Sequence, residues 1–125
     1  MPVDVTEQVI NALVINDITA LGTLMDDEVT WHAVDAVHSA CHNREEVLDL
    51  MQRQVAGGVR ADVIESRTAG PLVVVGMDLT APEGVVPDLP PDHRAYMVIT
   101  TRAGKVVHLQ DCVDRSHALG LAGIA

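Results

Sequence analysis

One carboxylate stands out in the sequence because of its aliphatic surroundings. Side chains alternate across a strand, and the strand predicted over residues 105–113 places Asp111 on one face with three aliphatic residues, Val107, Leu109 and Val113. A carboxylate in such surroundings is costly unless it is solvated, paired or functional. Asp111 is therefore either a proton-transfer group in an apolar pocket or a strand-end residue that is hydrogen-bonded near a turn.

The strand predicted over residues 94–102 carries two further polar candidates. Arg94, Tyr96 and Val98 alternate with their neighbours and share a face. A phenol in an apolar pocket can donate a hydrogen bond to a developing oxyanion, and a guanidinium supplies positive charge beside it. The alternatives are a core ring with a satisfied hydroxyl for Tyr96 and a rim position beside the proline-rich loop for Arg94.

Histidines and an acid crowd the segment that follows the first predicted strand: His32, Asp35, His38 and His42. A neutral imidazole can act as a base near neutral pH, which makes His32 a candidate, although a histidine at a strand end is often structural. A metal site needs three or four ligands that converge at ~2.0–2.2 Å, and this spacing does not enforce such convergence. We therefore expect no metal, and a loop over the pocket in which Asp35 and His38 make polar contacts.

Composition excludes several classes of function. The 125 residues, 48% of them hydrophobic, suffice for one domain over residues 1–125. A net charge of −10 argues against binding to nucleic acid or anionic lipid. Trp31 and Tyr96 are the only aromatic residues, too few for a base-stacking platform.

The chain shows no sign of membrane insertion or export. No stretch reaches the ~18 apolar residues of a membrane span, and the N-terminus does not read as a secretory signal. Cys41 and Cys112 are therefore expected to be free thiols in a cytoplasmic protein.

The elements that must position these residues follow from capping and periodicity. Asp4 or Thr6 begins a helix that ends near Asn16, and Asp17 caps a second one. Asn43 begins a third helix, which Gly57 ends. We expect strands over residues 28–33, 59–69 (with a bulge at Val63–Ile64), 72–81, 94–102 and 105–113, and a last helix capped by Asp114. Helices ahead of an antiparallel run of strands indicate an α+β fold, not a βαβ nucleotide-binding fold.

This element order and several local strings resemble the nuclear transport factor 2-like superfamily, in particular its SnoaL-like branch. The strings are residues 17–21, 24–32, 43–48, 104–107 and 110–115. The resemblance implies a cone-like, curved antiparallel sheet wrapped around three N-terminal helices, with an internal pocket and often a dimer through the outer face of the sheet. Members include steroid isomerases, polyketide cyclases, limonene-type epoxide hydrolases, dehydratases and carrier or scaffold proteins.

The resemblance also suggests roles for individual residues. Asp111 matches the catalytic aspartate of the epoxide hydrolases, and Arg94-Ala95-Tyr96 resembles their Arg-x-Asp pair, with Tyr96 in place of the second aspartate. In the steroid isomerases the position of Tyr96 holds an oxyanion-stabilising acid and that of His32 holds the base. The isomerases also use a tyrosine in the first helix, which this chain lacks, so an isomerase with the usual residues is excluded.

The sequence thus predicts a small cofactor-independent enzyme, or alternatively a non-catalytic ligand-binding or accessory protein. Asp111, His32, Tyr96 and Arg94 are its expected catalytic residues, with His32, Tyr96 and Asp111 opening into one cavity. An apolar substrate would undergo isomerisation, cyclisation or epoxide opening there. The expected pocket lining is Trp31, Asp35, His38, Leu109, Val113 and Val98. We also expect a homodimer.

Overall fold

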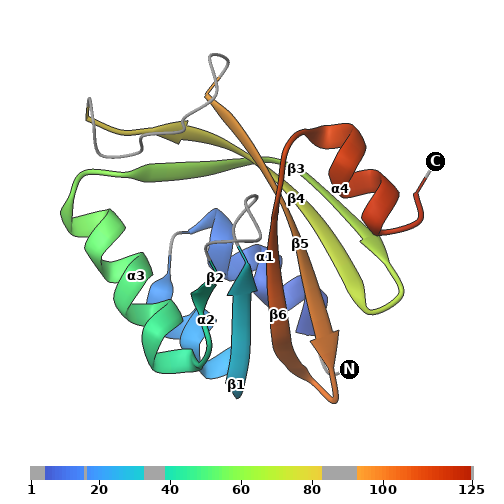
Figure 1. Cartoon of the computed structure of the whole chain (residues 1–125), viewed down its shortest axis with the longest axis horizontal. Coiled ribbons are helices and arrows are strands. Elements are labelled where there is room, and N and C mark those ends of the chain that lie inside the picture. The colour runs from blue at the N-terminus through green and yellow to red at the C-terminus, as the bar shows by residue number, and fades with distance from the viewer. Residues whose placement is uncertain (1–4, 16, 33–38, 83–92, 125) are drawn as a thin grey trace.

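The computed structural model describes residues 5–15, 17–32, 39–82 and 93–124 (Figure 1). Within these ranges the chain forms four helices and one six-stranded sheet. The helices are α1 (Val5–Val14), α2 (Ile18–Leu24), α3 (Arg44–Ala56) and α4 (Arg115–Leu121). The strands are β1 (Met25–His32), β2 (Ser39–Cys41), β3 (Arg60–Ala69), β4 (Leu72–Thr80), β5 (Arg94–Arg102) and β6 (Lys105–Cys112). The α+β class is confirmed.

Three helices begin where the sequence predicts, because a polar side chain satisfies a free backbone N–H group at each start. Asp17 accepts from the N–H of Ala20 before α2, and Asn43 accepts from the N–H of Glu46 before α3. Asp114 does the same for His117 at α4. The predicted caps are therefore confirmed.

The sheet is mixed, which corrects the expected antiparallel sheet. Its strand order is β2-β1-β6-β5-β4-β3. All neighbouring pairs are antiparallel except β1 and β6, which run parallel. Strand β1 therefore lies beside β6, far from it in sequence, and brings residues near Trp31 next to residues near Asp111.

The sequence predicts the bulge in β3 but not the short strand β2. The bulge predicted at Val63–Ile64 is confirmed, since the register of β3 against β4 shifts between Val63 and Glu65. The short strand β2 was not predicted, because its three residues follow the histidine-rich segment and carry no strand periodicity.

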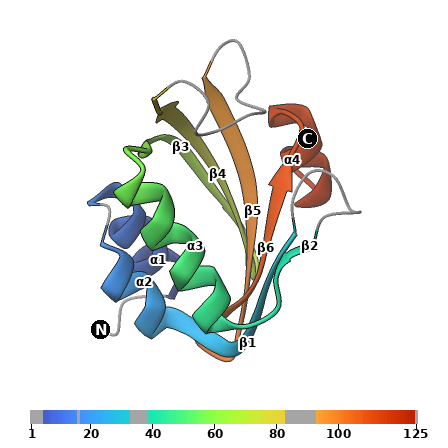
Figure 2. The ribbon, with the colours of Figure 1, turned by 60° about the vertical axis from the view of Figure 1, so that its left-hand side comes forward.

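The sheet separates two apolar layers. Helices α1, α2 and α3 cover one face, here called the inner face, and α4 covers part of the other, the outer face (Figure 2). The inner layer includes Trp31, Met97 and Leu109, whereas the outer one is formed by Val74, Val98, Cys112, Ala118 and Leu119. Which face a strand residue occupies therefore decides which layer it can serve.

Candidate active site

A carboxylate and an indole meet on the inner face of the sheet. The indole Nε1–H of Trp31 in β1 donates a hydrogen bond of 2.9 Å to Oδ1 of Asp111 in β6. Among the described residues, Oδ2 has no hydrogen-bond partner. It is not sealed from solvent either, since every fully enclosed polar side-chain atom there has a partner. One carboxylate oxygen is thus held in place while the other stays accessible.

The surroundings of Asp111 favour its protonated form. Burial raises the pKa of the carboxyl above its ordinary value of 3.8, and the hydrogen bond from Trp31 partly opposes this shift. In the structure no arginine opposes the effect of burial on Asp111. A mostly buried carboxyl with a raised pKa is suited to general acid and base catalysis.

Strand pairing sets the position of the indole. Trp31 lies opposite Cys41 of β2 on one side and opposite Leu109 of β6 on the other. Asp111 follows two residues after Leu109 on the same face and lies opposite Met97 of β5. The side chains around the carboxyl are buried in the inner layer and are an indole, a thiol and two apolar chains, those of Trp31, Cys41, Leu109 and Met97. The site is thus a single carboxylate in an apolar environment. Of the aliphatic residues that the sequence predicts beside Asp111, Leu109 is buried on the same face, whereas Val113 follows the end of β6 and is 65% exposed.

Tyr96, Arg94 and Val98 do not join this site. Tyr96 lies opposite Cys112, one residue beyond Asp111, so its side chain projects from the outer face. Val98 is buried in the outer layer with α4, and Arg94 alternates with Tyr96 on the same side. The prediction that Tyr96 and Asp111 open into one cavity is therefore wrong, because the register of β5 against β6 puts them on opposite faces.

His32 is also on the outer face. It ends β1 as predicted, but its ring contacts the ring of His108 edge-on, with centroids 4.7 Å apart. His108 alternates with Leu109, and its Nδ1 is 2.7 Å from the hydroxyl oxygen of Thr30. Burial and the neighbouring His32 lower the pKa of His108, against the opposing effect of its hydrogen bonds. His32 thus belongs to a polar cluster on the face opposite Asp111, and its predicted convergence with Asp111 is wrong.

Comparison with known proteins gives similarity only at the level of the fold. No protein-family model matches the sequence, and no curated protein matches it. A candidate polyketide cyclase from Sinorhizobium meliloti is 17% identical with a TM-score of 0.64, over 89% of this chain and 94% of that one. A nuclear transport factor 2-like protein of unknown function from Cytophaga hutchinsonii is 13% identical with a TM-score of 0.64, over 90% and 88%. The chain has the nuclear transport factor 2-like fold.

A third structure with this fold was solved with a small ligand. It is a hypothetical protein with a ketosteroid isomerase-like fold from Catenulispora acidiphila, in complex with trimethylamine. It is 19% identical with a TM-score of 0.60, over 100% of this chain and 96% of that one. The solved structures that share this fold thus include candidate cyclases, isomerase-like proteins and proteins of unknown function.

The remaining residues that the sequence predicts for the site divide into three groups. Leu109 is 3% exposed and lies beside Trp31 on the inner face. Val113 follows the end of β6 and is 65% exposed. Asp35 and His38 lie outside the described residues. Within the described part of the chain, no three histidine, cysteine or acidic side chains are grouped as metal ligands would be.

Two close contacts in the sheet were not predicted, and they differ in whether the sequence carries a signal for them. Cys41 lies beside Trp31 through the unpredicted strand β2. Burial and the charge of Glu46 raise its pKa, and burial raises the pKa of Cys112 to about 11, so both free thiols are protonated at neutral pH. Gly76 does have a signal, because a glycine inside a strand often marks a close approach of another group. The Tyr96 ring lies so close that a Cβ at Gly76 would come within 2.7 Å of it.

No helix in the described part of the chain has both the length and the hydropathy that crossing a bilayer requires.

Proposed function

We propose that the chain is a small, cofactor-independent enzyme that moves protons on an apolar small molecule, with Asp111 as the proton-transfer group. The observation that carries this proposal is the mostly buried carboxyl of Asp111, hydrogen-bonded through Oδ1 to Trp31 and accessible through Oδ2. Its raised pKa brings the carboxyl nearer to the pH at which it both accepts and returns a proton. The cyclase and isomerase-like names among the similar folds support the same class of reaction.

The chemistry follows from these two side chains. Asp111 Oδ2 would take a proton from a carbon next to a carbonyl group and deliver it to another carbon, which is isomerisation. Alternatively, the resulting enolate carbon would attack a second carbonyl carbon of the same molecule, whose C=O π bond breaks and whose oxygen takes the proton back from Asp111, which is cyclisation. The Trp31 N–H stays on Oδ1 throughout, fixing the direction in which Oδ2 points. An epoxide hydrolase of the Asp-Arg-Asp type is not proposed, because Arg94 lies on the opposite face from Asp111.

The substrate would lie in an internal pocket between the inner face and helices α1 to α3. Trp31, Leu109 and Met97 surround Asp111 on this face and would contact an apolar ligand. Apolar walls with a few polar groups are typical of sites for small molecules. That a protein with this fold binds trimethylamine supports a small organic ligand.

A second candidate function is ligand binding without catalysis. It is favoured by the composition of the inner face, where the described neighbours of Asp111 are an indole, a thiol and aliphatic side chains. Of these side chains, only the indole is a good hydrogen-bond donor for a developing oxyanion. Its N–H group is already hydrogen-bonded to Asp111. A carrier would need only the apolar surface and one polar anchor.

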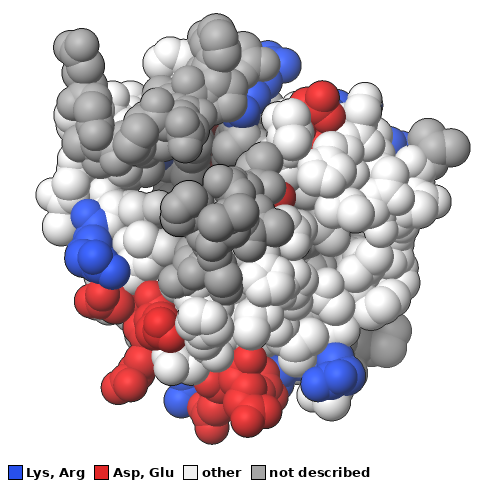
Figure 3. All heavy atoms as spheres, in the orientation of Figure 1, with Lys and Arg blue, Asp and Glu red and all other residues white. Residues whose placement is uncertain are grey.

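We further propose a homodimer that forms through the outer face. Figure 3 shows a broad surface with few Lys, Arg, Asp or Glu side chains over α4 and the adjoining part of β6. Arg102 and Lys105 lie at the turn of the β5–β6 hairpin, at the lower edge of this surface. Val113 and Leu121 expose 65% and 49% of their surface next to and within α4. Exposed apolar side chains on a surface with few charges often mark an interface between proteins.

Exchange of α-protons in deuterated water distinguishes the enzyme from the carrier. The probe is 2-tetralone, an apolar ketone, and its binding is followed by the fluorescence of Trp31, the only tryptophan. An enzyme accelerates exchange of the ketone protons, seen by proton NMR, and Asp111→Asn removes the acceleration. The matched control is Asp49→Asn, which changes an exposed carboxylate on α3. Binding without accelerated exchange would favour the carrier.

A further inference from the structure

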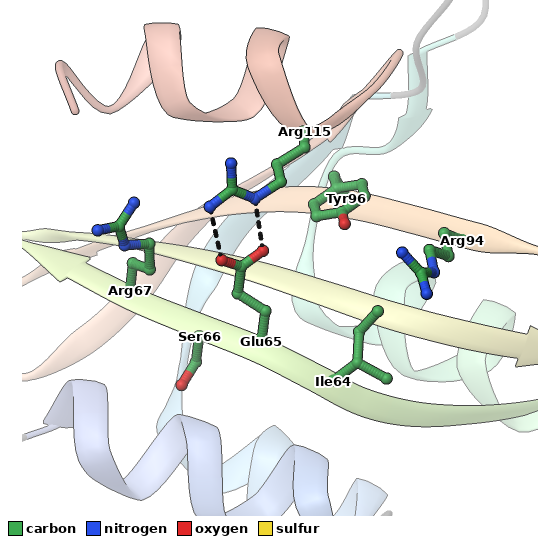
Figure 4. Close-up of a pocket in the computed structure, with 7 residues that line it drawn as sticks. All are labelled: Ile64, Glu65, Ser66, Arg67, Arg94, Tyr96 and Arg115. Carbon is green, nitrogen blue, oxygen red and sulfur yellow. Dashed lines mark hydrogen bonds and ion pairs between the residues drawn. The ribbon is translucent and has the colours of Figure 1, made fainter. Parts of the chain in front are cut away.

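The carboxylates of Glu65 and Asp111 differ in what balances their charge. Glu65 in β3 lies in a hollow on the outer face, where Arg115 donates from Nε to Oε1 at 2.8 Å and from Nη2 to Oε2 at 2.9 Å (Figure 4). These hydrogen bonds lower the pKa of Glu65. Asp111 has only the neutral indole of Trp31 as a donor to its side chain. In the part of the chain that the structure describes, no Lys, Arg or His side chain forms an ion pair with Asp111.

One oxygen of Asp111 is open to a donor from outside the chain. The N–H group of Trp31 holds Oδ1 at 2.9 Å, whereas Oδ2 accepts no hydrogen bond from the described residues and is not fully enclosed. An ionised carboxylate away from bulk water is costly unless it is both paired and hydrogen-bonded. A positively charged donor that reaches Oδ2 would therefore supply what the chain itself does not.

The walls around this oxygen are apolar and include an aromatic ring. Trp31, Leu109 and Met97 are buried, and none of the described residues that are fully buried carries a charge. The face of an indole ring attracts a cation, and the thioether of a methionine is polarisable and adapts to irregular shapes. The net charge of −10 also favours the approach of cations. The site thus combines one open acceptor with a surface that suits a cation bearing carbon groups.

The number of donors on such a cation follows from the single open oxygen. A protonated primary amine has three N–H donors, and those that find no acceptor would lose their hydrogen bonds to water without replacement, which is costly. A quaternary ammonium ion has no N–H donor and leaves Oδ2 without a hydrogen bond. A protonated tertiary amine has one N–H donor and three carbon substituents, which matches one acceptor among apolar walls.

We propose that the Asp111 site binds an apolar tertiary amine in its protonated form. The N–H group of the amine would donate to Oδ2, and its carbon groups would lie against Trp31, Leu109 and Met97. This inference rests on the internal pocket proposed above, but not on catalysis in it. Because the amine would occupy the oxygen that accepts a proton from the substrate, it should compete with an apolar ketone.

The test compares N-methylpiperidine at pH 7, where it is protonated, with N,N-dimethylpiperidinium, which has the same charge but no N–H donor. Binding is followed by the carboxyl-carbon NMR signal of Asp111 and by the fluorescence of Trp31, the only tryptophan. We expect the tertiary amine to change both signals in a saturable way and to displace 2-tetralone. The quaternary ion should bind about 10- to 100-fold more weakly, the range for a hydrogen bond to a charged group.

Two variants separate the site from the general negative charge of the chain. Asp111→Asn removes the charged acceptor and should weaken binding of the tertiary amine by about 10- to 100-fold. Asp49→Asn removes an exposed carboxylate on α3 that pairs with Arg53 and should leave the affinity unchanged. The proposal is overturned if the amine gives no saturable shift of the Asp111 signal, if the quaternary ion binds as tightly, or if Asp111→Asn binds as well as the wild type. Equal weakening by Asp49→Asn would also overturn it.

Proton exchange in 2-tetralone separates the amine site from the proposed enzyme. Accelerated exchange without binding of the amine would overturn the amine site and leave the enzyme in place. Binding of the amine without accelerated exchange would support the amine site and contradict the enzyme.

Discussion

The indole of Trp31 holds the carboxyl of Asp111 through a hydrogen bond of 2.9 Å between residues 80 positions apart in the chain. The bond is possible because β1 runs parallel to β6 and places Trp31 opposite Leu109. A buried carboxylate with this single bond is poorly compensated for the loss of water. Burial of Asp111 on the inner face should therefore lower the free energy of unfolding when the carboxyl is ionised, and this effect can be measured.

Asp111→Asn should lower activity and raise stability at the same time. Loss of a positioned acid or base costs about 10²–10⁴-fold in rate, measured here as α-proton exchange. Burial raises the pKa of Asp111 in the folded state above 3.8, so its contribution to the free energy of unfolding is lost as the pH rises through the folded pKa. The Asn side chain does not ionise, so the variant loses no stability as the pH rises. Its melting temperature at pH 7 should therefore exceed that of the wild type.

The stability difference should depend on pH. Below the unfolded pKa near 3.8, Asp111 is protonated in both states, and the advantage of the Asn variant should disappear. Thermal melts at pH 7 and at pH 3.5 check this difference. A variant that is less stable than the wild type at pH 7 would contradict the electrostatic account.

Trp31→Phe should raise the pKa of Asp111 further. The indole N–H stabilises the charged carboxylate, and Phe keeps most of the ring volume without the donor. The carboxyl carbon of Asp111, followed by NMR during a pH titration, should show a higher midpoint. Cys41→Ala alters the other neighbour of Trp31 without removing a donor to Asp111, and its midpoint should move less. An unchanged midpoint in Trp31→Phe would mean that the bond has no electrostatic effect.

Gly76→Ala should destabilise the protein through Tyr96. The added Cβ would come within 2.7 Å of the ring, and such overpacking costs about 1–3 kcal/mol. In the background of Tyr96→Ala the same change should cost less, because the ring is gone. Urea unfolding of the four proteins in this double-mutant cycle gives the coupling energy. Equal costs in the two backgrounds would exclude a contact between Tyr96 and position 76.

The proposed dimer should be seen by sedimentation at micromolar concentration. Leu121→Lys places a charge among the exposed apolar side chains at the end of α4, where Leu121 is 49% exposed, and should shift the equilibrium toward the monomer. Val14→Lys is the matched control, since Val14 is 56% exposed on α1, on the other side of the sheet. A wild-type protein that sediments as a monomer would remove the proposal.

Local order in this protein follows closely from the sequence. Asp17, Asn43 and Asp114 cap the helices as predicted, because a cap depends on residues only a few positions apart. The alternation that puts Asp111 with Leu109 on one face is likewise a property of a single strand. The bulge after Val63 could be predicted for the same reason.

The composition of the site was decided by pairing between strands. Alternation gives the faces within β5 and within β6 but not their relative register, and a shift of one residue exchanges the faces. In the structure Asp111 lies opposite Met97, and Tyr96 lies opposite Cys112, which places Tyr96 on the outer face with α4. The sequence by itself thus determined that Asp111 shares a face of its strand with the aliphatic Leu109. Only the tertiary structure decided that its partner is Trp31 and not Tyr96, because packing against helices on two different faces fixes the register.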